Sequence, residues 1–135
     1  MNVYQTKVKK LQGTDFREVR KKAFAVYQQI TKKSKRKPYI RSVYFKKEKI
    51  FLSLFWQHIW DKQKWQDRMR RLKFFQAGIE LISKSHLAPL SKKNPNKSGE
   101  ILHRFAGATK EKELFFVQIK ENKKGQKHLI SIFPK

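Results

Sequence analysis

Three apolar stretches joined by short polar connections make up the last 36 of the 135 residues, and they restrict the fold more than any other part of the chain. The stretches run from Glu100 to Ala108, from Glu113 to Glu121 and from Lys127 to Phe133. Their β-branched and aromatic residues are typical of strands. Because consecutive strands with short links pair side by side, we expect residues 100–135 to form a three-stranded antiparallel meander.

Residues 83–99 have the composition of a loop, with two prolines, one glycine, four serines and two asparagines in 17 residues. These residue types interrupt helices and strands and favour turns. A loop of this length inside a compact domain is usually functional or mobile. We expect it to separate the meander from a mainly helical part, residues 1–82, within a single domain of residues 1–135.

The first helical pattern follows Asp15, which forms a capping-box motif with Glu18. The apolar spacing predicts a helix of about 16 to 18 residues, which Pro38 stops. Tyr39 to Phe45 is rich in aromatic and β-branched residues and too short for a stable helix. This segment therefore predicts a further strand.

Two more helical patterns run from Ile50 to Ile59 and from Trp65 to Ile82. They are either joined at Asp61 to Lys64 or continuous as one bent helix. His58 lies on an apolar helix face, which favours a hydrogen-bonded core histidine over a ligand. The tryptophans either stack on bases or, as their helical spacing favours, pack in the core. The fold class predicted from these elements is α+β, with N-terminal helices packed on a small antiparallel sheet of about four strands.

The chain carries 34 Lys and Arg against 10 Asp and Glu, a formal net charge of +24. A compact domain with this charge repels itself, and the partner that most often balances it is nucleic acid. An acidic protein and an anionic membrane surface are the alternatives. The run from Lys32 to Lys37 is either a solvated linker or a set of phosphate contacts. The candidate RNA-binding side chains are Arg68, Arg70, Arg71, Arg104, Lys110 and Lys124.

Several classes of protein are excluded by what the sequence lacks. There is no cysteine, which excludes disulfides, thiolate zinc sites and cysteine nucleophiles. Met1 to Gly13 contains three lysines and no apolar segment typical of a secretory signal. The most apolar stretch, Ile50 to Ile59, has ten residues, whereas a membrane-spanning helix needs about 20. We therefore expect a cytoplasmic protein without a membrane partner.

The ten acidic residues are scattered along the chain, and so are the five glycines. Mg²⁺-dependent nucleases need several carboxylates that converge on the metal, and nucleotide hydrolysis needs a glycine-rich phosphate loop. Because neither pattern is present, we expect neither a metal nor another cofactor. The remaining His, Lys, Arg and Ser suit metal-independent RNA cleavage, in which the 2′-hydroxyl attacks the adjacent phosphate.

Strand alternation assigns the polar residues of the meander to faces. His103 shares a face with Ile101 and Phe105, which is typical either of a buried, hydrogen-bonded histidine or of a base at the edge of a core. Lys120 lies opposite the apolar row of its strand. It is either a solvated lysine at a strand end or a contact to phosphate.

The third strand of the meander contributes two candidates. Ser131 is assigned to the face of Leu129 and Phe133, where it is either a small filler or a hydroxyl that contacts substrate. His128 is assigned to the other face with Ile132, and it is a candidate for a second acid/base group.

The meander contains the strings His103-Arg104-Phe105-Ala106-Gly107, Phe116-Val117-Gln118-Ile119-Lys120 and Ser131-Ile132-Phe133-Pro134. Their order resembles the strand pattern of the BECR nuclease superfamily, which groups barnase, EndoU, colicin tRNases and RelE-like proteins, and of its phage- and toxin-type members in particular. The resemblance covers residues 100–134. It implies His103 as an acid/base group, Lys120 as a partner of the phosphate and Ser131 as a hydroxyl that orients the substrate.

Together, the resemblance and the charge predict a metal-independent endoribonuclease, either the toxin of a toxin–antitoxin pair or a phage-related effector. Its expected partners are RNA, free or on the ribosome, and an acidic antitoxin or inhibitor protein that covers the basic surface. The alternative is a non-catalytic basic protein that binds RNA, DNA or the ribosome.

Overall fold

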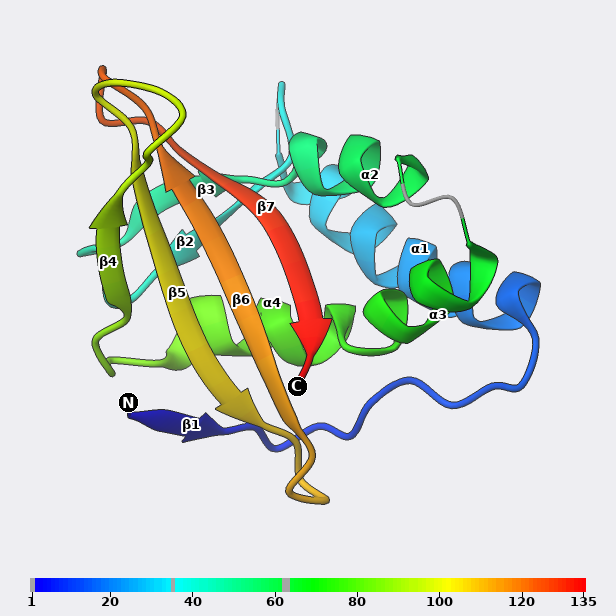
Figure 1. Cartoon of the computed structure of the whole chain (residues 1–135). Coiled ribbons are helices and arrows are strands. Elements are labelled where there is room, and N and C mark those ends of the chain that lie inside the picture. Colours follow the sequence, from blue (N-terminus) through cyan, green and yellow to red (C-terminus); the bar gives the residue numbers. More distant parts are fainter. Residues whose placement is uncertain (1, 35, 62–63) are drawn as a thin grey trace.

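The meander predicted from the last 36 residues forms the centre of the sheet in the computed structural model, which describes residues 2–34, 36–61 and 64–135 (Figure 1). Strands β5 (Ile101–Ala108), β6 (Leu114–Glu121) and β7 (Lys127–Pro134) pair antiparallel in that order. The predicted strand bounds are correct to within one residue, and the meander is confirmed.

Four shorter strands extend this sheet on both sides. On one side, β1 (Val3–Gln5) pairs parallel with the end of β5, and β4 (Leu90–Lys93) pairs antiparallel with its start. On the other side, β3 (Glu48–Phe51) pairs parallel with β7, and β2 (Tyr39–Ser42) pairs antiparallel with β3. The chain is α+β as predicted, but the described residues form a curled sheet of seven strands instead of about four.

Strand β2 confirms the strand predicted at Tyr39 to Phe45, although it ends three residues earlier, at Ser42. Strands β1, β3 and β4 escape sequence-based prediction because they bury few side chains. All residues of β4 are exposed, and the strand shows no apolar alternation. It is held by its backbone pairing with β5 and by the contact of the Ser91 hydroxyl with His103. It lies within residues 83–99, for which the composition predicts a loop throughout. In β3 only Ile50 is fully buried, and its apolar end continues directly into the next helix.

Four helices are present among the described residues. α1 (Phe16–Lys33) begins at its Asp15 cap, whose carboxylate accepts a hydrogen bond from the Arg17 backbone amide. The pattern that starts at Ile50 becomes helical only in α2 (Ser53–Trp60). The pattern from Trp65 to Ile82 is divided into α3 (Trp65–Lys73) and α4 (Phe75–Lys84). Within the predicted joint at Asp61 to Lys64, residues 62–63 lie outside the described residues.

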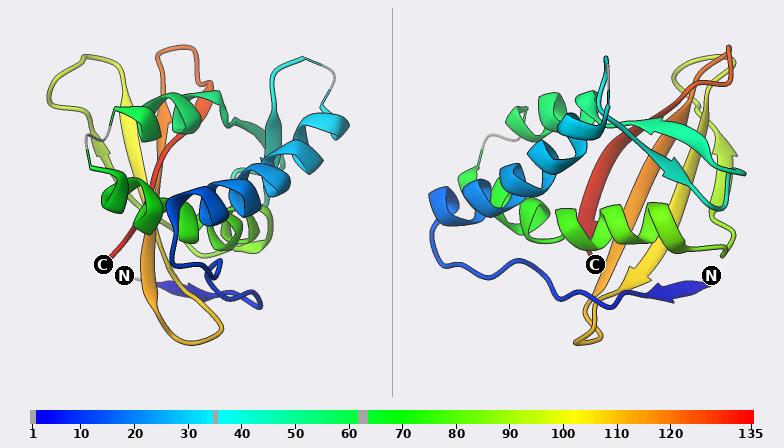
Figure 2. Two further views of the ribbon diagram at one scale, coloured as in Figure 1. Left: turned by 90° about the vertical axis from the view of Figure 1, so that its right-hand side faces the viewer. Right: turned by 180° about the vertical axis from the view of Figure 1, so that it is seen from behind.

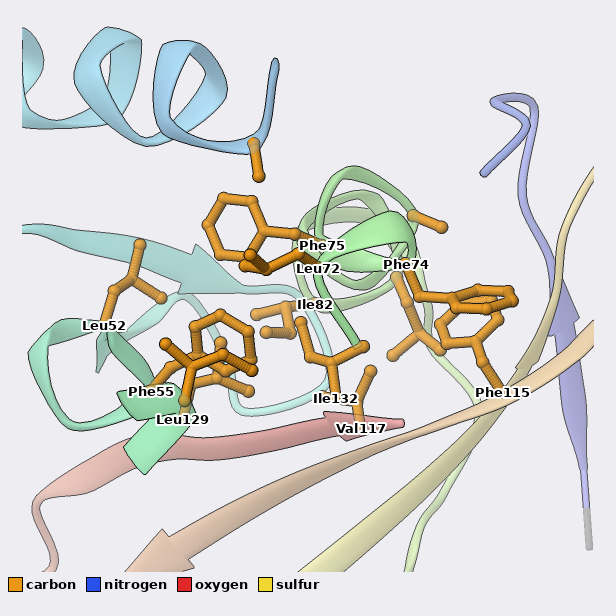
Figure 3. Packing of buried hydrophobic residues seen from close by; sticks show 14 of the residues in the cluster. Leu52, Phe55, Leu72, Phe74, Phe75, Ile82, Phe115, Val117, Leu129 and Ile132 are labelled. Atoms are coloured by element: carbon orange, nitrogen blue, oxygen red, sulfur yellow. The ribbon is translucent and has the colours of Figure 1, made fainter. Parts of the chain in front are cut away.

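The helices and one face of the sheet enclose a single hydrophobic core (Figure 3). Phe75 of α4 stacks on Phe55 of α2 with ring centroids 5.2 Å apart, and Phe74 stacks on Phe115 of β6 at 5.5 Å. Val19 of α1 is fully buried in the same cluster. The basic N-terminal part is therefore integral to the fold. Seen from behind, α4 lies across the sheet and α1 lies to the side of it (Figure 2).

The core imposes a strict size limit at Gly107 in β5. A Cβ atom at this position would lie 2.5 Å from Cζ of Phe115 and 2.8 Å from Cδ1 of Leu81. Since the Phe115 ring is fully buried, it has no space to move away. We expect Gly107→Ala to lower the free energy of unfolding by about 1–3 kcal/mol. Urea unfolding measures this change, and an unaltered midpoint would show that the core yields here.

Candidate nucleic-acid interface

The register of the meander gives the sheet two faces of different character. On one face Phe105 pairs with Val117 and Val117 with Ile132, and all three are buried. On the other face no described helix lies in front of β5 and β6, while α2 and α3 lie beside β7 (Figure 1). We call this second side the open face. It carries Leu102, Arg104, Phe116, Gln118, Lys120, His128, Ser131 and Phe133.

A β-bulge in β7 brings two predicted site residues to the open face. His128 pairs with Lys120 and Ser131 pairs with Gln118, so one extra residue, Ile130, lies between these pairs. An extra residue reverses the alternation of the strand beyond it. Strict alternation assigns His128 and Ser131 to opposite faces. That assignment is wrong, because it assumes a regular strand.

Two guanidinium groups, those of Arg71 and Arg104, contact both polar and aromatic side chains of the open face. Arg71 of α3 donates a hydrogen bond to the Ser131 hydroxyl at 2.7 Å, and Arg104 donates to the Gln118 side-chain oxygen at 3.1 Å. Both guanidiniums also lie 5.5 Å from the ring centroid of Phe133. Cations over partly exposed aromatic rings form a surface that suits both phosphates and bases.

His128 pairs with Lys120 on the open face, next to the pair of Gln118 and Ser131. Its ring centroid is 5.5 Å from that of Phe51 in β3. Burial lowers the pKa of His128 below its ordinary value of 6.5, and the charges of Lys120 and Lys37 lower it further, against a smaller opposite effect of Glu100. A lowered pKa keeps the ring neutral at physiological pH, and a neutral imidazole is able to accept a proton.

The Lys120 contribution to the pKa of His128 is testable by substitution. We expect Lys120→Met to raise this pKa only part of the way towards 6.5, because burial is the larger cause and remains. The matched control is Lys124→Met, which removes an exposed charge in the turn after β6. NMR titration of the ring protons measures both variants. An unchanged His128 titration in the Lys120 variant would contradict the proximity of the two groups.

His103 lies on the core face of the sheet, away from the other predicted site residues. It is 7% exposed, and its ring contacts that of Phe45 at 5.0 Å. Nδ1 lies 2.6 Å from the Ser91 hydroxyl and Nε2 lies 3.0 Å from a carboxylate oxygen of Glu121. Of the two interpretations of its sequence position, the geometry matches the buried, hydrogen-bonded histidine. The structure therefore brings Lys120, Ser131 and His128 to one face and leaves His103 on the other.

The remaining candidate RNA-binding cations occupy different surroundings. Arg68 lies over the Trp60 ring at 5.3 Å and contacts the Trp60 carbonyl oxygen, and Arg70 is exposed with Asp67 at 3.9 Å. Lys110 and Lys124 are exposed in the turns at opposite ends of β6. Of the predicted cations, Arg71 and Arg104 are the two that the structure places against open-face residues.

Sequence reasoning missed His58 as part of the site. This half-buried residue lines a hollow of about 260 Å³ between α2, α3 and β7, which Arg71 and Ser131 also line. Its Nδ1 lies 3.4 Å from the carbonyl oxygen of Ile130, the bulge residue. An apolar helical pattern around a histidine indicates only burial. Its position beside Ser131 depends on the bulge at Ile130, and no residue in the sequence indicates this bulge.

The tryptophans divide between the core and the surface. Trp56 packs between Tyr27 and Phe75, with ring centroids at 4.9 and 5.2 Å, as expected. Trp60 and Trp65 are 44% and 48% exposed, so the core prediction for them is wrong. Trp60 instead packs against basic side chains of its neighbours, with the Arg20 guanidinium 5.3 Å from its ring centroid.

Two other kinds of feature, a metal-binding cluster and a membrane-spanning helix, are not found in the described part of the chain. In residues 2–34, 36–61 and 64–135, no three His, Asp or Glu side chains gather so that they could hold a metal ion. None of the helices described here is long and apolar enough to cross a membrane.

The sequence matches no protein-family model and no curated protein, and the fold matches no solved structure.

Proposed function

We propose that the chain is a metal-independent endoribonuclease whose substrate lies across the open face. The observation that carries this proposal is the pairing of His128 with Lys120 on the open face. The next pair on this face is Gln118 with Ser131, and Arg71 donates a hydrogen bond to the Ser131 hydroxyl. A base held neutral, a cation beside it and a guanidinium close by are the groups that 2′-hydroxyl attack on a phosphate requires.

Each group has a role in the proposed reaction. The His128 imidazole takes the proton of the 2′-hydroxyl as the 2′-oxygen bonds to phosphorus. The bond between phosphorus and the 5′-oxygen breaks, and His58, in its imidazolium form, donates a proton to this leaving oxygen. Lys120 and Arg71 neutralise the charge that develops on the phosphorane. The products are a 2′,3′-cyclic phosphate and a 5′-hydroxyl, with one proton gained by His128 and one given up by His58.

The charge of the chain supports a polyanionic substrate. The excess of 24 positive charges draws RNA to the surface and makes binding dependent on salt. On the open face, Phe116 and Phe133 add rings on which bases stack, with centroids 5.5 Å apart. A smooth basic surface would bind RNA of any shape, whereas accessible rings favour unpaired bases.

Incubation of the purified protein with total RNA in excess chelator tests this function, in one arm without ribosomes and in another with ribosomes added. We expect fragments that end in a 2′,3′-cyclic phosphate in at least the second arm. RNA that stays intact in both arms, with binding that weakens as salt is added, would contradict the enzyme and favour the binding protein.

A non-catalytic RNA-binding protein is the second candidate. One observation favours it: the three residues that the resemblance implies as a catalytic group are divided between two faces of the sheet. A binding protein would use the same open face. It would tolerate replacement of His128 with little loss of affinity.

We propose a toxin or phage-related effector as the setting for this activity, and an acidic antitoxin or inhibitor protein as its partner. An endoribonuclease of this kind has to be restrained in its own cell. The net charge of +24 would speed association with an acidic protein.

A further inference from the structure

Arg36 and Lys37, at the end of the basic run, lie beside a second hollow, and the residues that line it are not among those of the open face. This hollow measures about 700 Å³, within the range of ligand sites. It is lined by Lys33, Arg36, Lys37, Tyr39, Lys49 and Phe51. Four of these residues are cationic, two are aromatic and none is acidic. Such a lining suits a ligand with both negative charge and flat rings.

The strand pairing connects this hollow to His128. Phe51 of β3 is in register with His128 of β7, and Tyr39 of β2 is in register with Phe51. The Tyr39 and Phe51 rings meet edge to face at 6.4 Å. The charge of Lys37 reaches His128 and lowers its pKa, as described above. Lys120, His128, Phe51 and Tyr39 therefore lie next to one another on four adjacent strands, and the last two line the hollow.

We propose that this hollow binds one nucleotide of single-stranded RNA, next to the phosphate at His128. The base stacks on Tyr39, and the flanking phosphates pair with Lys33, Arg36 and Lys37. The inference rests on the proposed function for the position of the scissile phosphate. It names the substrate class as single-stranded RNA, because a base has to leave its duplex partner to stack on a protein ring.

Two cations lie against the Tyr39 ring, the Lys49 ammonium 4.7 Å from its centroid and the Arg41 guanidinium 5.5 Å from it. An ammonium over a partly exposed ring is held more weakly than a stacked base. A base that stacks on Tyr39 therefore displaces the Lys49 ammonium, the nearer of the two cations, from the ring. The displaced ammonium stays within the hollow, where it adds a further cation near the phosphates.

Binding of an uncleavable RNA tests the inference separately from catalysis. The probe is a single-stranded 2′-O-methyl oligonucleotide of about 12 nucleotides, a length typical of such sites, with 2-aminopurine at each position in turn. It lacks the attacking hydroxyl. We expect Tyr39→Leu to weaken binding by about tenfold and to abolish quenching of 2-aminopurine, and Tyr39→Phe to preserve both.

The phosphate contacts have a separate signature. We expect the Arg36→Gln/Lys37→Gln double variant to flatten the dependence of log affinity on log salt, by about 0.7 for each phosphate that is no longer neutralised. Tyr39→Leu should leave this slope unchanged. The matched control is the Arg17→Gln/Lys21→Gln double variant, which removes two exposed charges from the first two turns of α1 and should change affinity less.

The outcomes separate the two proposals. Equal affinity of wild type and Tyr39→Leu for the single strand overturns the inference, as does equal affinity of the wild type for the single strand and its duplex. If the Tyr39 variants behave as expected while unmodified RNA remains intact, the nucleotide site stands and the endoribonuclease fails. Circular dichroism establishes folding of each variant. If the leucine variant unfolds, the comparison of single strand with duplex and the salt dependence of the Arg36→Gln/Lys37→Gln variant keep the inference testable.

Discussion

Replacing His128 with alanine is expected to lower the rate of RNA cleavage by about 10²- to 10⁴-fold, the usual contribution of a general base. The imidazole is half-buried, neutral at physiological pH and in register with Lys120. A side chain that cannot accept a proton leaves the 2′-hydroxyl unactivated. Because the cations of the open face remain, affinity for a 2′-O-methyl oligonucleotide should change little. Single-turnover cleavage and equilibrium binding measure the two effects.

The matched control is His103→Ala. This substitution removes the hydrogen bonds to Ser91 and Glu121 on the core face, so it lowers stability. Below its melting temperature, the folded variant should still cleave at a rate close to that of the wild type. The opposite pattern, with His103→Ala inactive and His128→Ala active, would restore the assignment that the resemblance implies and contradict the one proposed from the geometry.

Replacing Arg71 with glutamine has the second-largest expected effect, a loss of about 10²- to 10³-fold in cleavage rate. Its guanidinium is fixed by two contacts: it donates to the Ser131 hydroxyl at 2.7 Å and to a carboxylate oxygen of Asp67 at 3.3 Å. A cation held in place before the reaction stabilises the phosphorane without having to reorganise. The loss should appear in the rate of the chemical step more than in affinity.

Arg70→Gln is the control for this substitution. Arg70 precedes Arg71 on α3, carries the same charge and is exposed, with Asp67 at 3.9 Å. It makes no contact with Ser131 that the structure describes. We expect its replacement to weaken binding slightly and to leave the chemical step unchanged. Equal losses in both variants would show that Arg71 contributes only to the overall charge.

The fold could be predicted where side-chain patterns follow burial. The strands of the meander alternate apolar and polar residues, and α1 has both an apolar stripe and its Asp15 cap. Strands β1, β3 and β4 could not be predicted, because they bury few side chains and pair with their neighbours mainly through the backbone. β4 is exposed along its length, and β3 runs directly into α2 without a turn residue.

The site shows the same division. Lys120 and Arg104 could be assigned to a face, because β5 and β6 are regular strands. His128 and Ser131 could not, since the bulge at Ile130 shifts the register and has no glycine or proline to signal it. Arg71 and His58 come from helices, and only their packing beside β7 places them near Ser131.

The central claim is that RNA lies across the open face, and amide chemical-shift mapping tests it most directly. The titrant is the single-stranded 2′-O-methyl oligonucleotide, which binds without being cleaved. We predict that the amide signals of Arg104, Gln118 and Lys120 shift together, while those of Arg17 and Lys21 on α1 stay in place. Shifts confined to α1, with the signals of β5, β6 and β7 unchanged, would contradict this account.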